Sequence, residues 1–181
     1  MFAYCLFCQT EKSESICKAA ISSFQCRAVS PRQIQHTWSK GKMIDIERDL
    51  LPGYIFLYFD DEYPDVSNFR KLHGVIRCLS DSSRRYTLTG NDEQFALTLL
   101  QLGGRIGKTK VYREGDLIRI SEGVFSGLEA NILKVDRRAS RMQVEIPFAG
   151  RAVKTWIEYE IVEKAPGSSE TDALPEMAEN K

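Results

Sequence analysis

The chain has 181 residues, of which 43% are hydrophobic, and its 25 Lys and Arg residues balance 25 Asp and Glu residues. This composition predicts a folded protein with room for two small domains, and its zero formal charge leaves any contact with nucleic acid to a local basic patch. Every apolar run is shorter than the roughly 20 residues needed to cross a bilayer, so we expect no membrane role.

The chain begins with a strand pattern followed by a helix pattern. The apolar run from Ala3 to Cys8 predicts a buried strand. Ser13 is placed to cap the helix that follows. The apolar stripe of this helix consists of Ile16, Cys17, Ala20, Ile21 and Phe24. The polar stretch from Gln33 to Asp49 predicts a mobile loop or a hairpin.

A second strand is indicated directly after Leu51-Pro52-Gly53. The six residues from Tyr54 to Phe59 are aromatic, β-branched or otherwise apolar at every position. Such a run is typical of a strand that is covered on both faces.

The patterns that follow complete a mixed domain over residues 1–103. A short helix is predicted from Pro64 and Asp65, and a strand from Val75 to Leu79. Asn91 and Gln94 have the spacing of a capping box for a last helix, which Gly103-Gly104 would end. We therefore predict an α+β fold in which helices pack on a mostly antiparallel sheet.

Residues 104–110 are basic and contain glycine, which predicts a linker. Beyond them the helical periodicity disappears. Short strands separated by turn residues are indicated at Leu117–Ile120, Ala130–Val135, Met142–Phe148, Val153–Ile157 and Ile161–Val162. This pattern predicts a small all-β barrel over residues 111–164, and the acidic tail 165–181 is expected to be disordered.

Two segments, in this order, resemble the NusG family of transcription elongation factors. The run Leu51-Pro52-Gly53-Tyr54-Ile55-Phe56-Leu57 is similar to the Phe-Pro-Gly-Tyr-aliphatic segment of the family's N-terminal NGN domain. Gly115-Asp116-Leu117-Ile118-Arg119-Ile120, with Gly123-Val124-Phe125-Ser126-Gly127, looks like a KOW motif, although Ala130 stands where many such motifs have a glycine. The resemblance implies an NGN domain joined to a KOW barrel, and a protein that is not an enzyme.

The resemblance also implies a surface for bacterial RNA polymerase. In NusG-like proteins an apolar depression docks on the clamp helices of the polymerase, and it maps here onto Tyr54, Phe56 and Tyr58. Alternation places these three residues on one face of the strand, free for a partner, unless the whole run is core. Ser67 and Asn68 align with the segment that contacts the opposite side of the polymerase cleft, which would suppress pausing. Their alternative role is helix capping and solvation.

Positive charge is concentrated in the predicted barrel, which indicates an RNA-binding face. Between Ile132 and Lys154, two acidic residues, Asp136 and Glu145, stand against six basic ones. These are Lys134, Arg137, Arg138, Arg141, Arg151 and Lys154. We expect the turn 136–141 and the hairpin 150–154 to lie at one end of the barrel. The alternative is an ordinary solvated face.

Within the family, the Arg137-Arg138 pair and the opening Tyr112–Asp116 are more similar to the specialised antitermination paralogue LoaP. This implies a monomer that binds polymerase, recognises an RNA hairpin or leader, and promotes antitermination. One rival interpretation is a housekeeping NusG that links polymerase to Rho or a ribosomal protein. Another is a ribosome-associated KOW module.

Three sequence patterns resemble metal-binding, nucleotide-binding or catalytic motifs but lack residues that such motifs require. Cys5 and Cys8 have no second pair downstream, so we expect no zinc site. Gly103–Thr109 lacks the first glycine of a phosphate-binding loop and precedes a strand, so we expect no nucleotide or other cofactor. His36 and His73 have no nucleophile and carboxylate beside them, so we expect no catalytic residues. Five irregularly spaced cysteines and the lack of a signal-peptide pattern predict a reduced cytoplasmic protein.

Overall fold

The computed structural model describes the chain over residues 1–60, 64–114, 117–122, 124–125 and 130–162. The chain divides into two compact units. Unit 1 comprises residues 1–106 together with Phe148–Arg151, and unit 2 comprises residues 107–147 together with the chain from Ala152 onward. The first part of the chain contains both helices and strands, and the residues described after α2 form strands without helices, which confirms the predicted fold class.

Unit 1 is built on a four-stranded sheet with the order β2-β5-β1-β6. Its strands are β1 (Phe2–Cys8), β2 (Arg27–Val29), β5 (Tyr54–Phe59) and β6 (Val75–Cys78). β5 lies in the interior of the sheet and pairs antiparallel with both β1 and β2. The predicted strands of this part of the chain are therefore confirmed.

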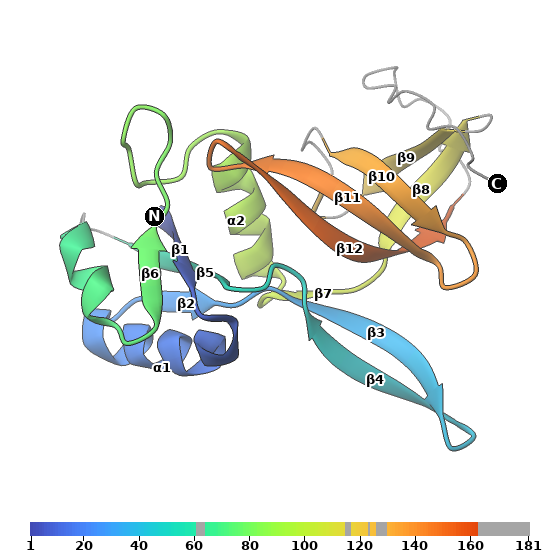
Figure 1. Ribbon diagram of the computed structural model, residues 1–181, viewed down its shortest axis with the longest axis horizontal. Helices are drawn as coiled ribbons and strands as arrows, with labels where there is room; N and C mark the ends of the chain where they lie inside the picture. The colour runs from blue at the N-terminus through green and yellow to red at the C-terminus, as the bar shows by residue number, and fades with distance from the viewer. Residues whose placement is uncertain (61–63, 115–116, 123, 126–129, 163–181) are drawn as a thin grey trace. The chain divides into compact units, whose positions relative to one another are not determined.

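Two α-helices, α1 (Ser13–Phe24) and α2 (Asn91–Gln101), cover opposite faces of this sheet (Figure 1). The core beneath α1 contains Ile16 and Ala20 from the helix and Ile55 and Leu57 from β5. Ile21 was assigned to the buried stripe but is 47% exposed, so the stripe is narrower than predicted. Two short 3-10 helices, η1 (Thr10–Lys12) and η2 (Val66–Lys71), also belong to the unit.

The caps predicted for the two α-helices are wrong. Ser13 is the first residue of α1, and its hydroxyl donates to the carbonyl oxygen of Thr10 at 2.9 Å instead of accepting from the helix. The reason is that η1 leads directly into α1, so no extended residue precedes the helix to carry a capping side chain. At α2 the preceding residue is Gly90, with φ at 62°, and Asn91 is already helical.

The polar stretch before β5 is a hairpin, the second of the two structures predicted for it. Its strands are β3 (Arg32–Ser39) and β4 (Lys42–Asp49), which extend away from the four-stranded sheet (Figure 1). Lys40 and Gly41 both have positive φ and form the two-residue turn, as a hairpin of this length requires. Ion pairs join the strands at Arg32–Asp49 (2.7 Å) and His36–Asp45 (2.6 Å).

Most of the predicted linker is strand. Arg105–Ile106 forms β7, which pairs in parallel with β3. β8 (Thr109–Glu114) starts after only Gly107 and Lys108. The pairing of β7 with the hairpin explains the difference, because it gives the backbone at the start of the predicted linker a hydrogen-bonding partner.

Unit 2 contains a five-stranded sheet with the order β10-β11-β12-β8-β9. Its other strands are β9 (Leu117–Glu122), β10 (Asn131–Asp136), β11 (Arg141–Phe148) and β12 (Arg151–Ile161). β12 is one continuous strand where the sequence predicted two. β8 and β12 are parallel neighbours, with Thr109 opposite Tyr159 and Val111 opposite Ile161.

Two of the sequence-based predictions lie outside the described residues. One concerns the turn residues of the KOW motif: Gly115, Asp116, Gly123, Ser126 and Gly127. The other is the tail 165–181. The described residues of the motif include Val124 and Phe125, both of which are buried.

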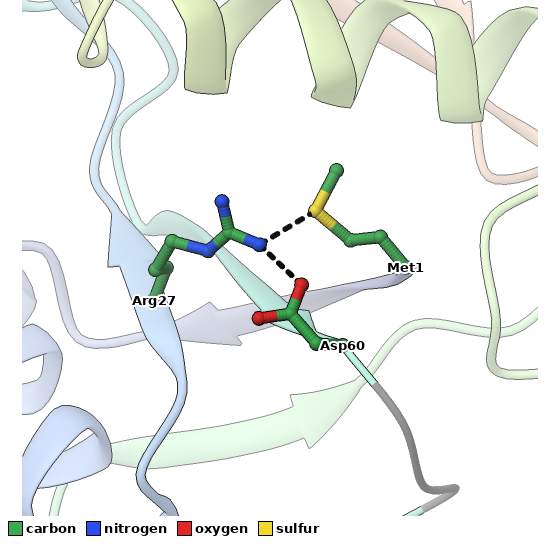
Figure 2. A network of polar contacts seen from close by, with 3 residues as sticks. All are labelled: Met1, Arg27 and Asp60. Atoms are coloured by element: carbon green, nitrogen blue, oxygen red, sulfur yellow. Dashed lines mark hydrogen bonds and ion pairs between the residues drawn. The ribbon is translucent and has the colours of Figure 1, made fainter.

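An exposed polar network joins the edge strand β2 to the end of β5. The Nη2 atom of Arg27 lies 2.5 Å from Oδ1 of Asp60 and 2.9 Å from the sulfur of Met1 (Figure 2). The side chains of Arg27 and Asp60 are 50% and 70% exposed, so solvent screens the pair. Its contribution to stability is therefore on the order of 0–1 kcal/mol.

Candidate functional site

Strand β5 carries the three aromatic residues predicted to contact polymerase. Helices pack on both faces of this strand. Phe56 and Tyr58 are buried on the α2 side, where the Phe56 ring lies 5.9 Å from the Phe95 ring and the Tyr58 hydroxyl donates to the Ala96 carbonyl at 2.7 Å. The second face is therefore covered at Phe56 and Tyr58, because the apolar residues of α2 pack on it. This agrees with the strand covered on both faces that the apolar run predicted, and not with the free face that the family resemblance implied. Burial also raises the pKa of the Tyr58 phenol.

Tyr54 is the half-buried member of the three aromatic residues. Its ring makes edge contacts with Phe7 at 5.3 Å and with Phe148 at 6.4 Å between centroids. Phe148, which belongs to unit 1, also lies 5.5 Å from Phe56 and 5.6 Å from Phe95. The aromatic residues Tyr54 and Phe56 of β5 therefore belong to a cluster of rings in which Phe148 contacts both of them.

Asp92 holds the backbone beside this ring cluster. Its carboxylate accepts a hydrogen bond from the N–H of Ala149 at 2.9 Å. Burial raises the pKa of the Asp92 carboxyl, although the hydrogen bond from Ala149 stabilises its charged form. Asp92 was not singled out in the sequence, where it looks like an ordinary acidic residue in the first turn of a helix.

The second predicted polymerase contact lies at the start of η2. Ser67 is exposed and Asn68 is half-buried. The helix is capped by Asp65, whose carboxylate accepts from the backbone N–H of Ser67 at 2.9 Å, and hydrogen bonds from Ser67 lower the pKa of that carboxyl. The backbone N–H of Ser67 is thus used in capping, while the residue itself remains exposed at the surface.

Basic residues line β10, β11, β12 and the turn between β10 and β11. Lys134, Arg137 and Arg138 are exposed, whereas Arg141 is half-buried. Among the described residues, two of the six predicted basic residues have acidic partners: Arg141 with Asp136 at 3.7 Å, and Lys154 with Glu145 at 3.4 Å. The net positive charge of this surface therefore comes mainly from Lys134, Arg137 and Arg138.

The two basic turns do not lie together. Arg137 and Arg138 precede β11, whereas Gly150 and Arg151 follow it. An eight-residue strand separates the turns by roughly 25 Å. The expectation that both lie at one end of the barrel is wrong, because a single extended strand connects them.

Trp156 is a surface residue that was not predicted from the sequence. It is 41% exposed on β12, between the buried residues Thr155 and Ile157. The guanidinium carbon of Arg141 lies 5.8 Å from the centre of its ring, within the range of a cation–π contact. The alternation of buried and exposed residues in β12 was the available signal, because it places this tryptophan in the polar phase of the strand.

Among the residues that the structure describes, no cluster of three or more His, Cys, Asp or Glu side chains is arranged to hold a metal ion. No helix in these ranges is both long and apolar enough to cross a membrane.

Comparison with known proteins gives a family match over the first part of the chain. The family model described as "Transcription termination factor nusG" matches residues 3–95, which include α1, β5, all of β1 but its first residue, and the start of α2. This range is slightly more than half of the chain.

Curated relatives extend the similarity beyond that range. The transcription termination/antitermination protein NusG of Vibrio parahaemolyticus is 27% identical over 128 residues, covering 68% of this chain and 69% of that protein. The protein of the same name from Rickettsia typhi is 21% identical over 126 residues, covering 69% and 66%. The matches therefore span about two thirds of the length of these relatives.

A solved structure, described as "Domain interaction in Thermotoga maritima NusG", is similar over most of the chain. The similarity covers 87% of this chain and 93% of the chain in that structure, with a TM-score of 0.52. Because the sequences are only 16% identical, this similarity bears on the fold alone.

Proposed function

This chain belongs to the NusG family of transcription factors, and from that membership we propose that it binds bacterial RNA polymerase through unit 1 and promotes processive elongation and antitermination, with RNA contacted by unit 2. The family match over residues 3–95, which include α1 and β5, carries the first part of the proposal. The exposed Arg137-Arg138 turn, which lies next to Arg141 and its partner Trp156, supports the second. No catalytic step or cofactor is involved.

The proposed polymerase surface is the aromatic face of β5. NusG-family proteins bind RNA polymerase, and Tyr54 is the residue of this face that solvent reaches in part. A clamp helix would rest its apolar side chains on Tyr54 and Phe56 once the ring of Phe148 has left the cluster. Tyr58 would stabilise this surface without contacting the clamp helix, because its hydrogen bond to Ala96 joins β5 to α2.

Ser67 and Asn68 are the proposed second contact with polymerase. Ser67 is exposed at the N-terminal end of η2, which Asp65 fixes by capping. Two contacts on opposite sides of the polymerase cleft would hold the clamp closed and reduce pausing. The mechanism is one of binding energy alone.

The proposed RNA surface comprises Lys134, Arg137, Arg138 and Arg141, with Lys154 on the same sheet. Exposed arginines bind phosphates and structured RNA well, because the guanidinium group makes bidentate hydrogen bonds. Arg151 lies at the other end of β11 and would contribute a separate contact. A hairpin or leader of the transcript is the RNA that a LoaP-like factor would recognise.

Readthrough of an intrinsic terminator by purified bacterial RNA polymerase tests the proposal. Templates with and without the leader of the chain's own operon are compared, with and without the protein. We expect readthrough that depends on the leader and is lost when both Arg137 and Arg138 are replaced by Ala. The matched control replaces Arg84 and Arg85, an exposed arginine pair in unit 1, and should leave readthrough unchanged.

Binding to polymerase without any effect on readthrough would contradict antitermination. That outcome would favour a housekeeping factor that links polymerase to Rho or to a ribosomal protein. RNA binding without polymerase binding would instead favour a ribosome-associated module. Pull-down of polymerase by wild type and by the Tyr54→Ala variant separates these outcomes.

A further inference from the structure

The outer face of β10, β11 and β12 contains one large aromatic side chain among charged ones. Trp156 is 41% exposed, and the alternation of β12 places it on the same face as Lys154. Lys154 pairs with Glu145 of β11, and the guanidinium group of Arg141, also on β11, lies over the indole ring at 5.8 Å. The tryptophan is therefore surrounded by the residues proposed to contact RNA.

Asp136 contacts Arg141 on this face. Asp136 lies opposite Arg141 in the β10–β11 ladder, and its Oδ2 atom is 3.7 Å from the guanidinium group. Its other oxygen accepts from the backbone N–H of Ala139 at 2.9 Å, within the turn that carries Arg137 and Arg138. One carboxylate thus contacts both the arginine over the indole and the backbone of the basic turn beside it.

We propose that Trp156 and Arg141 form a platform on which an unpaired nucleobase of RNA stacks, while Arg137 and Arg138 contact the phosphates on either side. This inference rests on the proposed RNA binding by unit 2 and names the feature of the RNA that is recognised: a base that is not held in a duplex. Aromatic rings and guanidinium planes are the groups on which splayed bases stack in sequence-tolerant RNA binding. A paired base offers no free face to such a platform.

Tryptophan fluorescence gives a direct test, because the chain contains only two tryptophans. The full-length Trp38→Phe variant leaves Trp156 as the only reporter. It is titrated with a mixed-sequence single-stranded RNA and with the duplex formed by that RNA and its complement. We expect the single strand to quench Trp156 emission at saturation, and the duplex to bind without this quenching.

Affinities measured by anisotropy with the same labelled RNAs complete the test. Trp156→Ala should weaken binding of the single strand by about tenfold and leave binding of the duplex nearly unchanged, whereas Trp156→Phe should retain most of the affinity. Replacing both Arg137 and Arg138 by Ala should weaken binding of both RNAs and lower its salt dependence, but leave quenching at saturation intact. Far-UV circular dichroism verifies that each variant is folded.

The outcomes separate the two proposals. RNA binding without quenching, or equal affinity of Trp156→Ala and wild type for the single strand, would refute the stacking platform and leave RNA binding in place. The absence of binding to either RNA and to the leader transcript would refute RNA binding by unit 2, and the platform with it.

Discussion

Strands β5 and β12 both carry aromatic residues but use them in opposite ways. In β5, four consecutive residues from Ile55 to Tyr58 are at most 1% exposed, because helices cover both faces of the sheet. In β12, Thr155 and Ile157 are buried while Trp156 between them is 41% exposed. The same residue class thus builds the core of unit 1 and part of the surface of unit 2.

The difference shows how the pattern around an aromatic residue matters more than the residue itself. An unbroken apolar run indicates a strand that is covered on both faces, so its aromatic residues are expected to pack in the core. An aromatic residue in the polar phase of an alternating strand, such as Trp156, stands at a position that the alternation predicts to face solvent. It is therefore the better sign of a contact surface.

The largest expected effect is the loss of the Phe56 ring. Phe56→Ala should lower the free energy of unfolding of unit 1 by about 3–5 kcal/mol, because it leaves a cavity between Phe95 and Phe148. Urea unfolding followed by thiol accessibility measures this, since all five cysteines precede residue 106. Met43→Ala, at a residue that is 57% exposed, is the control and should change stability by less than about 0.5 kcal/mol. A loss below about 1 kcal/mol for Phe56→Ala would show that its ring is not core.

The cysteines give the next largest effect. Burial raises the pKa of Cys17 to about 12, of Cys26 to about 11 and of Cys78 to about 12. Because the thiolate is the reactive form, a rise of two pKa units lowers its fraction at pH 8 by about a hundredfold. Alkylation by iodoacetamide should therefore be slower by at least this factor in the folded protein than in urea, and should accelerate as the pH rises toward 11. Rates equal to those of the unfolded chain would mean that the β5 core opens readily.

Removal of the Tyr58 hydroxyl tests how much the contact between β5 and α2 contributes to stability. Tyr58→Phe removes the hydrogen bond to Ala96 while keeping the ring, and should cost about 1 kcal/mol of stability. Tyr86→Phe, at an exposed tyrosine of the same unit, is the matched control and should have little effect. If Tyr58 instead only contacts polymerase, Tyr58→Phe would weaken polymerase binding without changing stability.

The smallest effect is expected in β12. Trp156→Phe should change the stability of unit 2 by less than about 0.5 kcal/mol, because an aromatic ring remains under Arg141 and the position is partly solvated. Ile157→Ala at the neighbouring buried position should cost about 2–5 kcal/mol. Thermal unfolding monitored by circular dichroism compares the two. Equal losses would remove the contrast between the faces of β12.

Much of the fold follows from the sequence, because periodicity reports burial directly. The run Tyr54–Phe59, the strands around it and the loss of helical spacing after residue 110 predicted the α+β and all-β parts. The ends of elements were harder to predict. Ser13 looks like a cap by residue type alone, and only the preceding 3-10 turn determines that its hydroxyl bonds to Thr10 instead.

The candidate site was predictable only in part. Counting charges along the sequence identified Arg137 and Arg138, and both are exposed. Their separation from Arg151 depends on the length of β11, which a count of basic residues ignores. The covering of Phe56 depends on contacts between residues far apart in the chain, with Phe95 and Phe148, which local patterns do not contain.

The parallel pairing of β8 and β12 has a mechanical consequence. The chain enters this ladder at Thr109, opposite Tyr159, and leaves it at Ile161, opposite Val111. A pull on the segment before β8 and an opposite pull on the segment after β12 would load the two strands in shear, so their hydrogen bonds would bear the force together instead of opening one after another. Unit 2 is thereby suited to stay folded when the chain is pulled from both ends of this ladder.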